Sequence, residues 1–151
     1  HEYLKIKEVF LGFVDGLSID QIKIYARPEF DGFQMAEIRL GLKNLSLEKV
    51  MFYARPDFDS NQMKEIRLGF TNGLTQEQID IYAKPEFNSY QMKQIRLGLE
   101  HGLSLEQVKL YAKSDLSPFI MRKIREELEK TVKQSNKKSK RRSSEINLSK
   151  E

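Results

Sequence analysis

Apolar and polar positions alternate along the chain at the spacing of an α-helix. Met35, Ile38 and Leu42 fall on one stripe of a helical wheel, and Phe33 and Leu40 fall on nearly the opposite stripe. A helix that is apolar on two sides suits the middle of a stack, where a neighbour covers each side. The pattern therefore predicts an all-α fold built from stacked helices.

The pattern recurs along the chain at intervals of 28, 29 and 29 residues. The string YARPEF at 25–30 returns as YARPDF at 53–58, as YAKPEF at 82–87 and, degraded, as YAKSDL at 111–116. A second string, QMAEIRLG from Gln34, returns at the same intervals as QMKEIRLG, QMKQIRLG and IMRKIREE. Units of this length with short loops predict an α-solenoid of about four helix-turn-helix repeats of 28–29 residues.

Each unit carries two helix-start signals. A Ser, Thr, Asp or Asn stands before each predicted helix, and a Gln usually stands three positions later, which is the capping-box pattern. The longer helices are predicted at 2–14, 32–43, 60–71, 89–100 and 118–134. The shorter helices are predicted at 19–26, 47–54, 76–83 and 105–112. A left-handed residue is expected to end each longer helix, namely Gly16, Gly73 and Gly102, or Asn44 in the unit that is one residue shorter.

Glycine also recurs inside the longer helices, at Gly41, Gly69 and Gly98. Because glycine costs a helix interior about 1 kcal/mol relative to alanine, its recurrence predicts a close backbone crossing. At the end of the pattern, Glu126 and Glu127 replace the Leu-Gly pair, which turns a face between units polar as a cap requires. At its start, Phe10 stands in place of a recurring arginine, which fits either a cap or the remnant of a missing upstream unit.

The string YAKPEF…QMKQIRLGLEHGLSLEQVKLYAK, at 82–113, resembles the short tandem helical repeats of uncharacterised proteins from clostridial-type bacteria and their mobile elements. The resemblance covers roughly residues 5–127. It implies a helical-repeat protein of the bacterial cytoplasm, and it brings no established activity or site residue with it. His101 and the C-terminal tail fall outside what the resemblance explains.

Charge is concentrated at the C-terminal end. The chain of 151 residues has 26 Lys and Arg against 22 Asp and Glu, a formal net charge of +4. Residues 129–151 alone carry eight basic and three acidic side chains, so the remaining chain has a net charge of −1. This predicts a helical-repeat domain at 1–134 and a basic tail at 135–151 that is disordered or frays from the end of a helix.

The amino-acid composition excludes several kinds of catalytic and metal-binding site. The absence of cysteine excludes thiolate metal sites and cysteine nucleophiles, and two histidines give little from which to build a metal site or a triad. His101 stands alone at a predicted helix end, so we expect no enzyme activity, no catalytic or metal-binding residue and no cofactor. No apolar run approaches the length of a membrane span and no signal peptide is recognisable, so a cytoplasmic location is expected, with no membrane partner.

Positions that vary between units are the expected contact sites for a protein partner, because positions that stay constant usually serve packing. The candidate partner-binding residues lie at the starts of the longer helices and are Phe33, Ala36, Asn61, Lys64, Tyr90 and Lys93. The sequence does not specify the partner or the oligomeric state, and the chain could also serve as a spacer within a longer protein.

A second hypothesis is binding to nucleic acid. The recurring arginines Arg39, Arg67, Arg96 and Arg125 could grip phosphates, with Tyr25, Tyr53, Tyr82 and Tyr111 stacking on bases. The same arginines could instead form internal salt bridges with Glu29, Asp57, Glu86 and Asp115, and the tyrosines could pack with their tips at the solvent edge; we favour these structural interpretations. The tail is the better candidate for phosphate contacts, through Lys137, Lys138, Lys140, Arg141 and Arg142.

Overall fold

Over the part of the chain that the structure describes, α-helices connected by short turns make up the fold and no strand is present. The computed structural model covers residues 1–150, with side chains described up to residue 148. The helices are α1 (Glu2–Val14), α2 (Ile19–Tyr25), α3 (Gly32–Asn44), α4 (Leu47–Tyr53), α5 (Ser60–Thr71), α6 (Gln76–Tyr82), α7 (Ser89–Glu100), α8 (Leu105–Lys109) and α9 (Pro118–Lys150). The all-α fold class is confirmed.

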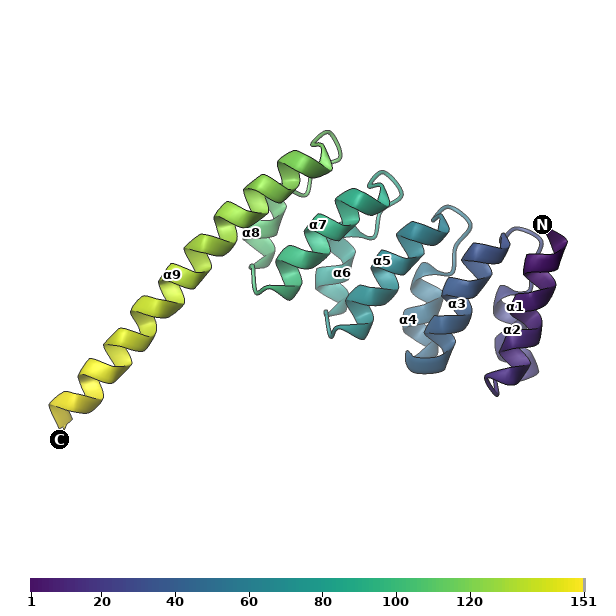
Figure 1. Cartoon of the computed structure of the whole chain (residues 1–151), viewed down its shortest axis with the longest axis horizontal. Coiled ribbons are helices and arrows are strands. Elements are labelled where there is room, and N and C mark those ends of the chain that lie inside the picture. The colour runs from purple at the N-terminus through teal and green to yellow at the C-terminus, as the bar shows by residue number, and fades with distance from the viewer. Residues whose placement is uncertain (151) are drawn as a thin grey trace.

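The helices form two layers (Figure 1). The long helices α1, α3, α5, α7 and α9 lie side by side in chain order, and each contacts the next. The short helices lie behind them, and α2, α4 and α6 each pack against the two long helices that flank them in the sequence. The two chain ends therefore lie at opposite ends of the molecule, and α9 projects beyond the stack.

The predicted capping boxes are confirmed. At the start of α3, the Asp31 carboxylate accepts a hydrogen bond from the Gln34 amide N–H at 2.8 Å, and the Gln34 side-chain oxygen accepts from the Asp31 N–H at 2.9 Å. The same reciprocal pair opens α2, α5, α6, α7 and α8. At α4, Ser46 accepts from the Lys49 N–H, but the lysine side chain cannot complete the box, as the sequence indicated.

The left-handed residues expected after the longer helices are confirmed at three of the four positions. Gly16, Gly73 and Gly102 have φ values of 79°, 91° and 97°, in the left-handed region that favours glycine. The expectation for Asn44 is wrong: it is the last residue of α3, and Leu45 follows with an extended backbone at φ −111°. Because this unit lacks one residue, the chain passes directly from the helix into the extended segment.

The predicted end of the last helix is also wrong. The sequence suggested a helix that ends near residue 134 and a tail that is disordered or frays from the helix end, whereas α9 continues to Lys150. Side chains from Lys133 to Leu148 are exposed, so intrahelical hydrogen bonds and the helix preference of Lys and Arg support this part of α9. Glu151, the final residue of the predicted tail, lies outside the described residues.

A tyrosine fixes each short helix to the long helix before it. Tyr25, Tyr53, Tyr82 and Tyr111 have no exposed surface, so the expected position at the solvent edge is wrong. The Tyr82 hydroxyl donates to the backbone carbonyl of Glu65 at 2.8 Å, and the other three tyrosines make the equivalent bond to Glu8, Glu37 and Gln94. Each hydroxyl lies 1.9 to 2.1 Å from the position that a β-carbon would take at Gly12, Gly41, Gly69 or Gly98, which is too close for any side chain. The recurring glycine is thus required by a close contact, although a tyrosine makes it rather than a second backbone.

Candidate functional site

The recurring arginines lie between neighbouring long helices. Their side chains are 12% (Arg39), 17% (Arg67), 8% (Arg96) and 9% (Arg125) exposed. The Nε of each donates to a side chain two residues before the equivalent position of the preceding long helix, which is Phe10 in α1 and an arginine in the others. The four pairs are Arg39 with Glu8 at 2.7 Å, Arg67 with Glu37 at 2.7 Å, Arg96 with Glu65 at 2.7 Å and Arg125 with Gln94 at 3.0 Å.

The expected acidic partners of these arginines were wrong, although their engagement in internal contacts was expected. Glu29 and Asp57 lie in exposed turns, where they pair with Arg27 and Arg55 instead. The sequence did hold the correct signal, because a glutamate recurs two residues before the arginine in the string EIR. Only the register between neighbouring helices shows that the glutamate of one unit meets the arginine of the next.

Further contacts occupy the ends of three arginine side chains. Arg39 also donates to Asp15 at 2.5 Å, and this hydrogen bond lowers the pKa of the Asp15 carboxyl below its usual value. Arg96 and Arg125 each donate to a glutamate one helical turn further on, Glu100 at 2.9 Å and Glu129 at 2.8 Å. The arginines are therefore engaged by protein side chains, and a phosphate would have to compete with these bonds.

His101 belongs to the same network. Its Nδ1 lies 2.7 Å from the Glu129 carboxylate, which also accepts from Arg125. The equivalent position in the preceding unit is Asn72, which donates to Glu100 at 3.0 Å. The histidine thus has a partner on the next long helix, a contact that sequence reasoning missed. The recurrence of polar residues at this position was the available signal.

Five of the six candidate partner-binding residues are exposed, in contrast to the recurring arginines and tyrosines. Phe33 is 64% exposed and Tyr90 is 71% exposed, and Asn61, Lys64 and Lys93 are exposed as well. Ala36 is half-buried beside Phe33 on α3. The starts of the long helices therefore carry side chains that the helix stack does not use.

Four of these side chains come together in one groove between α5 and α7. The groove has a volume of about 190 Å³. It is lined by Asn61, Lys64, Glu65, Ser89, Tyr90 and Lys93. Phe33 and Ala36 lie one helix away, on α3, and do not line it. We call this hollow the α5/α7 groove.

The α5/α7 groove combines cationic, aromatic and polar groups. Over the described residues, Lys64 and Lys93 form no ion pair within 4.0 Å, whereas the only carboxylate in the lining, Glu65, is engaged by Arg96. Tyr90 offers an exposed ring, and Asn61 and Ser89 offer an amide and a hydroxyl. This set suits an anionic side chain and the backbone of an extended peptide.

Sequence reasoning did not include the equivalent residues of α9. Phe119 is 57% exposed, and it lies 29 residues after Tyr90 at the same position of its helix. The guanidinium of Arg122 lies 5.5 Å from the centre of the Phe119 ring. The interval of 29 residues was the signal that could have identified both. Aromatic and basic side chains thus extend along the helix starts from α7 to α9.

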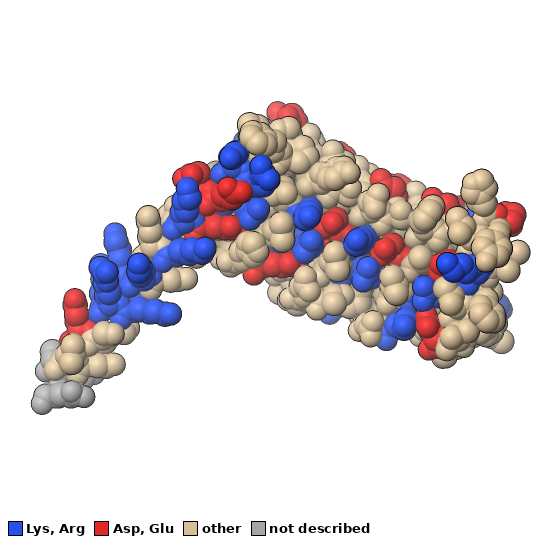
Figure 2. Space-filling view, viewed as in Figure 1, with Lys and Arg blue, Asp and Glu red and all other residues tan. Residues whose placement is uncertain are grey.

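The charge distribution differs between the stack and the projecting helix. In Figure 2, Lys and Arg side chains alternate with Asp and Glu side chains across the layer of long helices. On the distal part of α9 the cationic side chains gather together (Figure 2). They are Lys137, Lys138, Lys140, Arg141 and Arg142, all of them exposed, and none has an ion-pair partner within 4.0 Å in the described part of the chain.

Within residues 1–148, no group of three His, Asp or Glu side chains is placed to hold a metal ion, and no buried side-chain nitrogen or oxygen lacks a hydrogen-bond partner. None of the helices, as far as the structure describes them, combines the length and the apolar character that crossing a membrane requires.

The chain matches no protein-family model, no curated protein and no solved structure in the comparisons made.

Proposed function

We propose that the chain is an α-solenoid of about four helix-turn-helix repeats that acts as a non-enzymatic interaction module. Its partner is a protein segment that lies across the starts of the long helices, with anionic side chains directed at the α5/α7 groove. The observation that carries this proposal is the gathering of Asn61, Lys64, Tyr90 and Lys93 in one groove, although they belong to different units.

The contrast between constant and variable positions supports the proposal. Constant side chains such as Tyr82 and Arg96 are buried in contacts between helices. Variable side chains such as Lys64 and Tyr90 face solvent, where substitution costs the fold little. A partner can therefore be recognised by these positions without any change to the packing that holds the helices together.

The chemistry of the groove favours an acidic, extended segment. The ammonium groups of Lys64 and Lys93 have no carboxylate partners and attract anions. Attraction between opposite charges raises the association rate of a complex more than its affinity. An exposed tyrosine supplies apolar contact area at low entropic cost. We further propose a location in the bacterial cytoplasm, which the resemblance to clostridial tandem repeats supports.

The test is selection of peptides from a random display library on the full chain, followed by affinity measurement with labelled peptides. A variant with Lys64→Glu and Lys93→Glu should weaken the selected acidic peptides by at least about tenfold. The matched control carries Lys23→Glu and Lys109→Glu, which make the same change of charge on the short helices α2 and α8. Equal weakening by both variants, or none by either, would refute the groove as the binding site.

A second candidate function is binding to nucleic acid through α9. The supporting observation is the exposed cluster of Lys137, Lys138, Lys140, Arg141 and Arg142 on a projecting helix. A helix of this kind fits the major groove of duplex DNA, where each cation paired with a phosphate releases counterions. In this second hypothesis the stack of helices orients the basic segment.

The second candidate is tested by fluorescence anisotropy of labelled duplex and single-stranded nucleic acids at low and moderate salt. The full chain should bind with a steep salt dependence, and a chain that ends at Gln134 should not bind. Binding by the shortened chain would instead direct attention to the arginines between the long helices. If neither chain binds at low salt, this function is excluded.

A further inference from the structure

The outward face of α1 exposes five large apolar side chains at the N-terminal end of the helix stack. The exposed fractions are 75% for Tyr3, 65% for Ile6, 63% for Phe10, 57% for Phe13 and 63% for Val14. On a helical wheel the five span one side of α1, with the exposed Glu2 and Lys7 at its two edges. We call this surface the α1 stripe. So many exposed apolar side chains on one helix of 13 residues mark an interaction surface.

Three of the five α1 stripe positions, those of Tyr3, Ile6 and Phe13, are buried at the equivalent place in α3. Ile6 and Phe13 correspond to Met35 and Leu42 of α3, which are 2% and 7% exposed and lie in the core. The stripe is therefore apolar at positions that other long helices use to pack against their neighbours. The opposite end of the stack differs, because a groove on α9 has the charged Lys123 and Glu127 in its lining beside the half-buried Ile124 and Leu128.

The α1 stripe is nevertheless unsuited to another unit of the same kind. Phe10 stands where α3 has Arg39, so it cannot form the ion pair that joins neighbouring long helices. Tyr3 stands where α3 has Gly32, and a β-carbon at Gly32 would already lie 2.6 Å from the β-carbon of Leu4. A long helix could therefore not approach Tyr3 as closely as α1 approaches α3. The occupant must fit a different geometry.

The spacing of the stripe fits pairing with itself. Tyr3, Ile6, Phe10 and Phe13 follow one another at intervals of three, four and three residues, which is the a/d pattern of a coiled-coil seam. In an antiparallel pair of α1 helices, Phe10 lies level with Ile6 of the second copy, and Tyr3 lies level with Phe13. Head-to-tail joining would instead place the stripe against the charged side chains Lys123 and Glu127.

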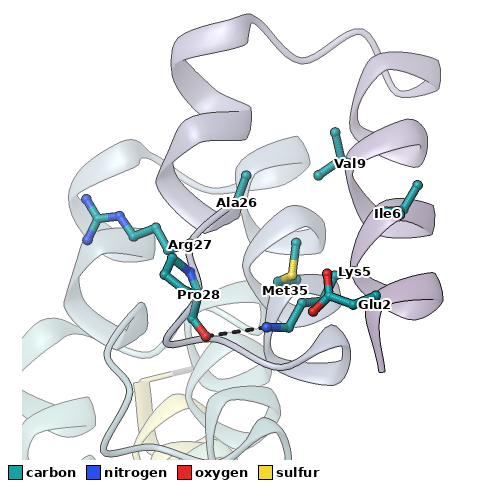
Figure 3. Close-up of a pocket in the computed structure, with 8 residues that line it drawn as sticks. All are labelled: Glu2, Lys5, Ile6, Val9, Ala26, Arg27, Pro28 and Met35. Carbon is teal, nitrogen blue, oxygen red and sulfur yellow. Dashed lines mark hydrogen bonds between the residues drawn. The ribbon is translucent and has the colours of Figure 1, made fainter.

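A groove beside the stripe adds to this fit. It has a volume of about 330 Å³ and lies between the start of α1 and the segment that follows α2 (Figure 3). Its apolar lining includes Ile6, Val9 and Met35, and the Lys5 ammonium donates to the Pro28 carbonyl at 3.3 Å at one side. Ile6 and Phe13 lie on the same edge of the helical wheel. Two-fold antiparallel pairing therefore brings Phe13 of the second copy to the mouth of this groove.

We propose that the α1 stripe is the interface of a symmetric homodimer in which the α1 helices pair antiparallel. Five apolar side chains, at roughly 100 to 150 Å² each, would remove about 1,000 to 1,500 Å² from water over both copies. This area reaches the lower end of the range for specific interfaces. The interface leaves the α5/α7 groove and the distal part of α9 free, so the dimer is independent of both proposed functions.

The test is sedimentation equilibrium of the full chain over a range of concentrations. The wild-type chain should show a concentration-dependent dimer, and Phe10→Glu should raise the dissociation constant by at least about tenfold. Leu47→Glu, at a 55% exposed position at the start of α4, is the matched control and should leave the dimer unchanged. Far-UV circular dichroism verifies that both variants fold. A monomer at all concentrations, or a dimer that tolerates Phe10→Glu, overturns the proposal.

The orientation can be tested because the chain contains no cysteine. Oxidation of a mixture of Ile6→Cys and Phe10→Cys chains should give mainly the mixed disulfide dimer, since these positions face each other in the antiparallel pair. Phe10→Cys chains that cross-link to one another as readily as in the mixture would indicate parallel pairing, and this result would contradict the proposed interface.

Discussion

The hydroxyl oxygen of Tyr111 lies only 2.1 Å from the position that a β-carbon of residue 98 would take, so glycine is the only residue type that accommodates the tyrosine there. The same hydroxyl donates to the Gln94 carbonyl at 2.7 Å, one turn earlier in α7. The contact joins the turn after α8 to α7, and its counterparts join each short helix to the long helix before it. Two residue types that recur in the sequence are thus explained by one contact.

Gly98→Ala is expected to destabilise the protein by about 1 to 3 kcal/mol, because the added methyl group overlaps the Tyr111 hydroxyl. Tyr111→Phe should cost about 1 kcal/mol for the lost hydrogen bond. With the hydroxyl absent, the nearest remaining atom to the new methyl is Leu103 Cδ1 at 3.0 Å, so the double variant should be less destabilised than the sum. Urea unfolding of the four chains measures this coupling, and strict additivity would disprove the steric explanation.

Arg96→Leu is expected to destabilise the protein by about 3 kcal/mol, at the lower end of the range for breaking a buried ion pair. The loss leaves Glu65, whose side chain is 12% exposed, without its cation. Arg27→Leu is the control, because its pair with Glu29 is 3.7 Å long and exposed and should contribute less than about 1 kcal/mol. Equal unfolding free energies for the two variants would contradict the structural role of Arg96.

Alkaline pH is expected to unfold the protein through its buried tyrosines. Burial raises the pKa of Tyr25 to about 12, and burial also raises the pKa values of Tyr53, Tyr82 and Tyr111 well above 10. The unfolded chain releases these protons near pH 10, whereas the folded chain retains them. Stability is therefore complete below about pH 10 and falls as the pH rises through the folded-state values.

Urea midpoints measured together with tyrosinate absorbance between about pH 8 and pH 12 test this linkage. Tyr25→Phe should make the stability profile flatter, because one of the linked protons is removed. Tyrosinate absorbance from the buried rings should appear together with the loss of helical signal. Full ionisation of all the tyrosines in a chain that remains folded would be incompatible with their burial.

Removal of the residues after Gln134 is expected to reduce the far-UV helical signal per molecule without a change in the urea midpoint. The removed segment is helical, but its side chains up to Leu148 are exposed, so it adds no core. The unfolding free energy should change by less than about 0.5 kcal/mol. An unchanged helical signal would show that this segment is not helical in solution, as the sequence had suggested.

The sequence by itself determined the helices and most of their ends. Apolar spacing, capping residues and left-handed glycines are local signals, because they depend on neighbours within one or two turns. They placed the starts of α3, α5 and α7 at Gly32, Ser60 and Ser89, as observed. The local signals failed where no tertiary contact decides the outcome, as in the distal part of α9, or where a deletion removed the turn residue, as at Asn44.

Only the tertiary structure decided which groups meet and which remain free. The pairing of Arg39 with Glu8 depends on the register of two helices that are separated by a whole unit, and no local pattern specifies that register. The burial of the tyrosine hydroxyls, the assembly of the α5/α7 groove and the exposure of the α1 stripe have the same origin. Helix formation is governed by contacts close in sequence, whereas a binding surface consists of what remains after distant segments have packed together.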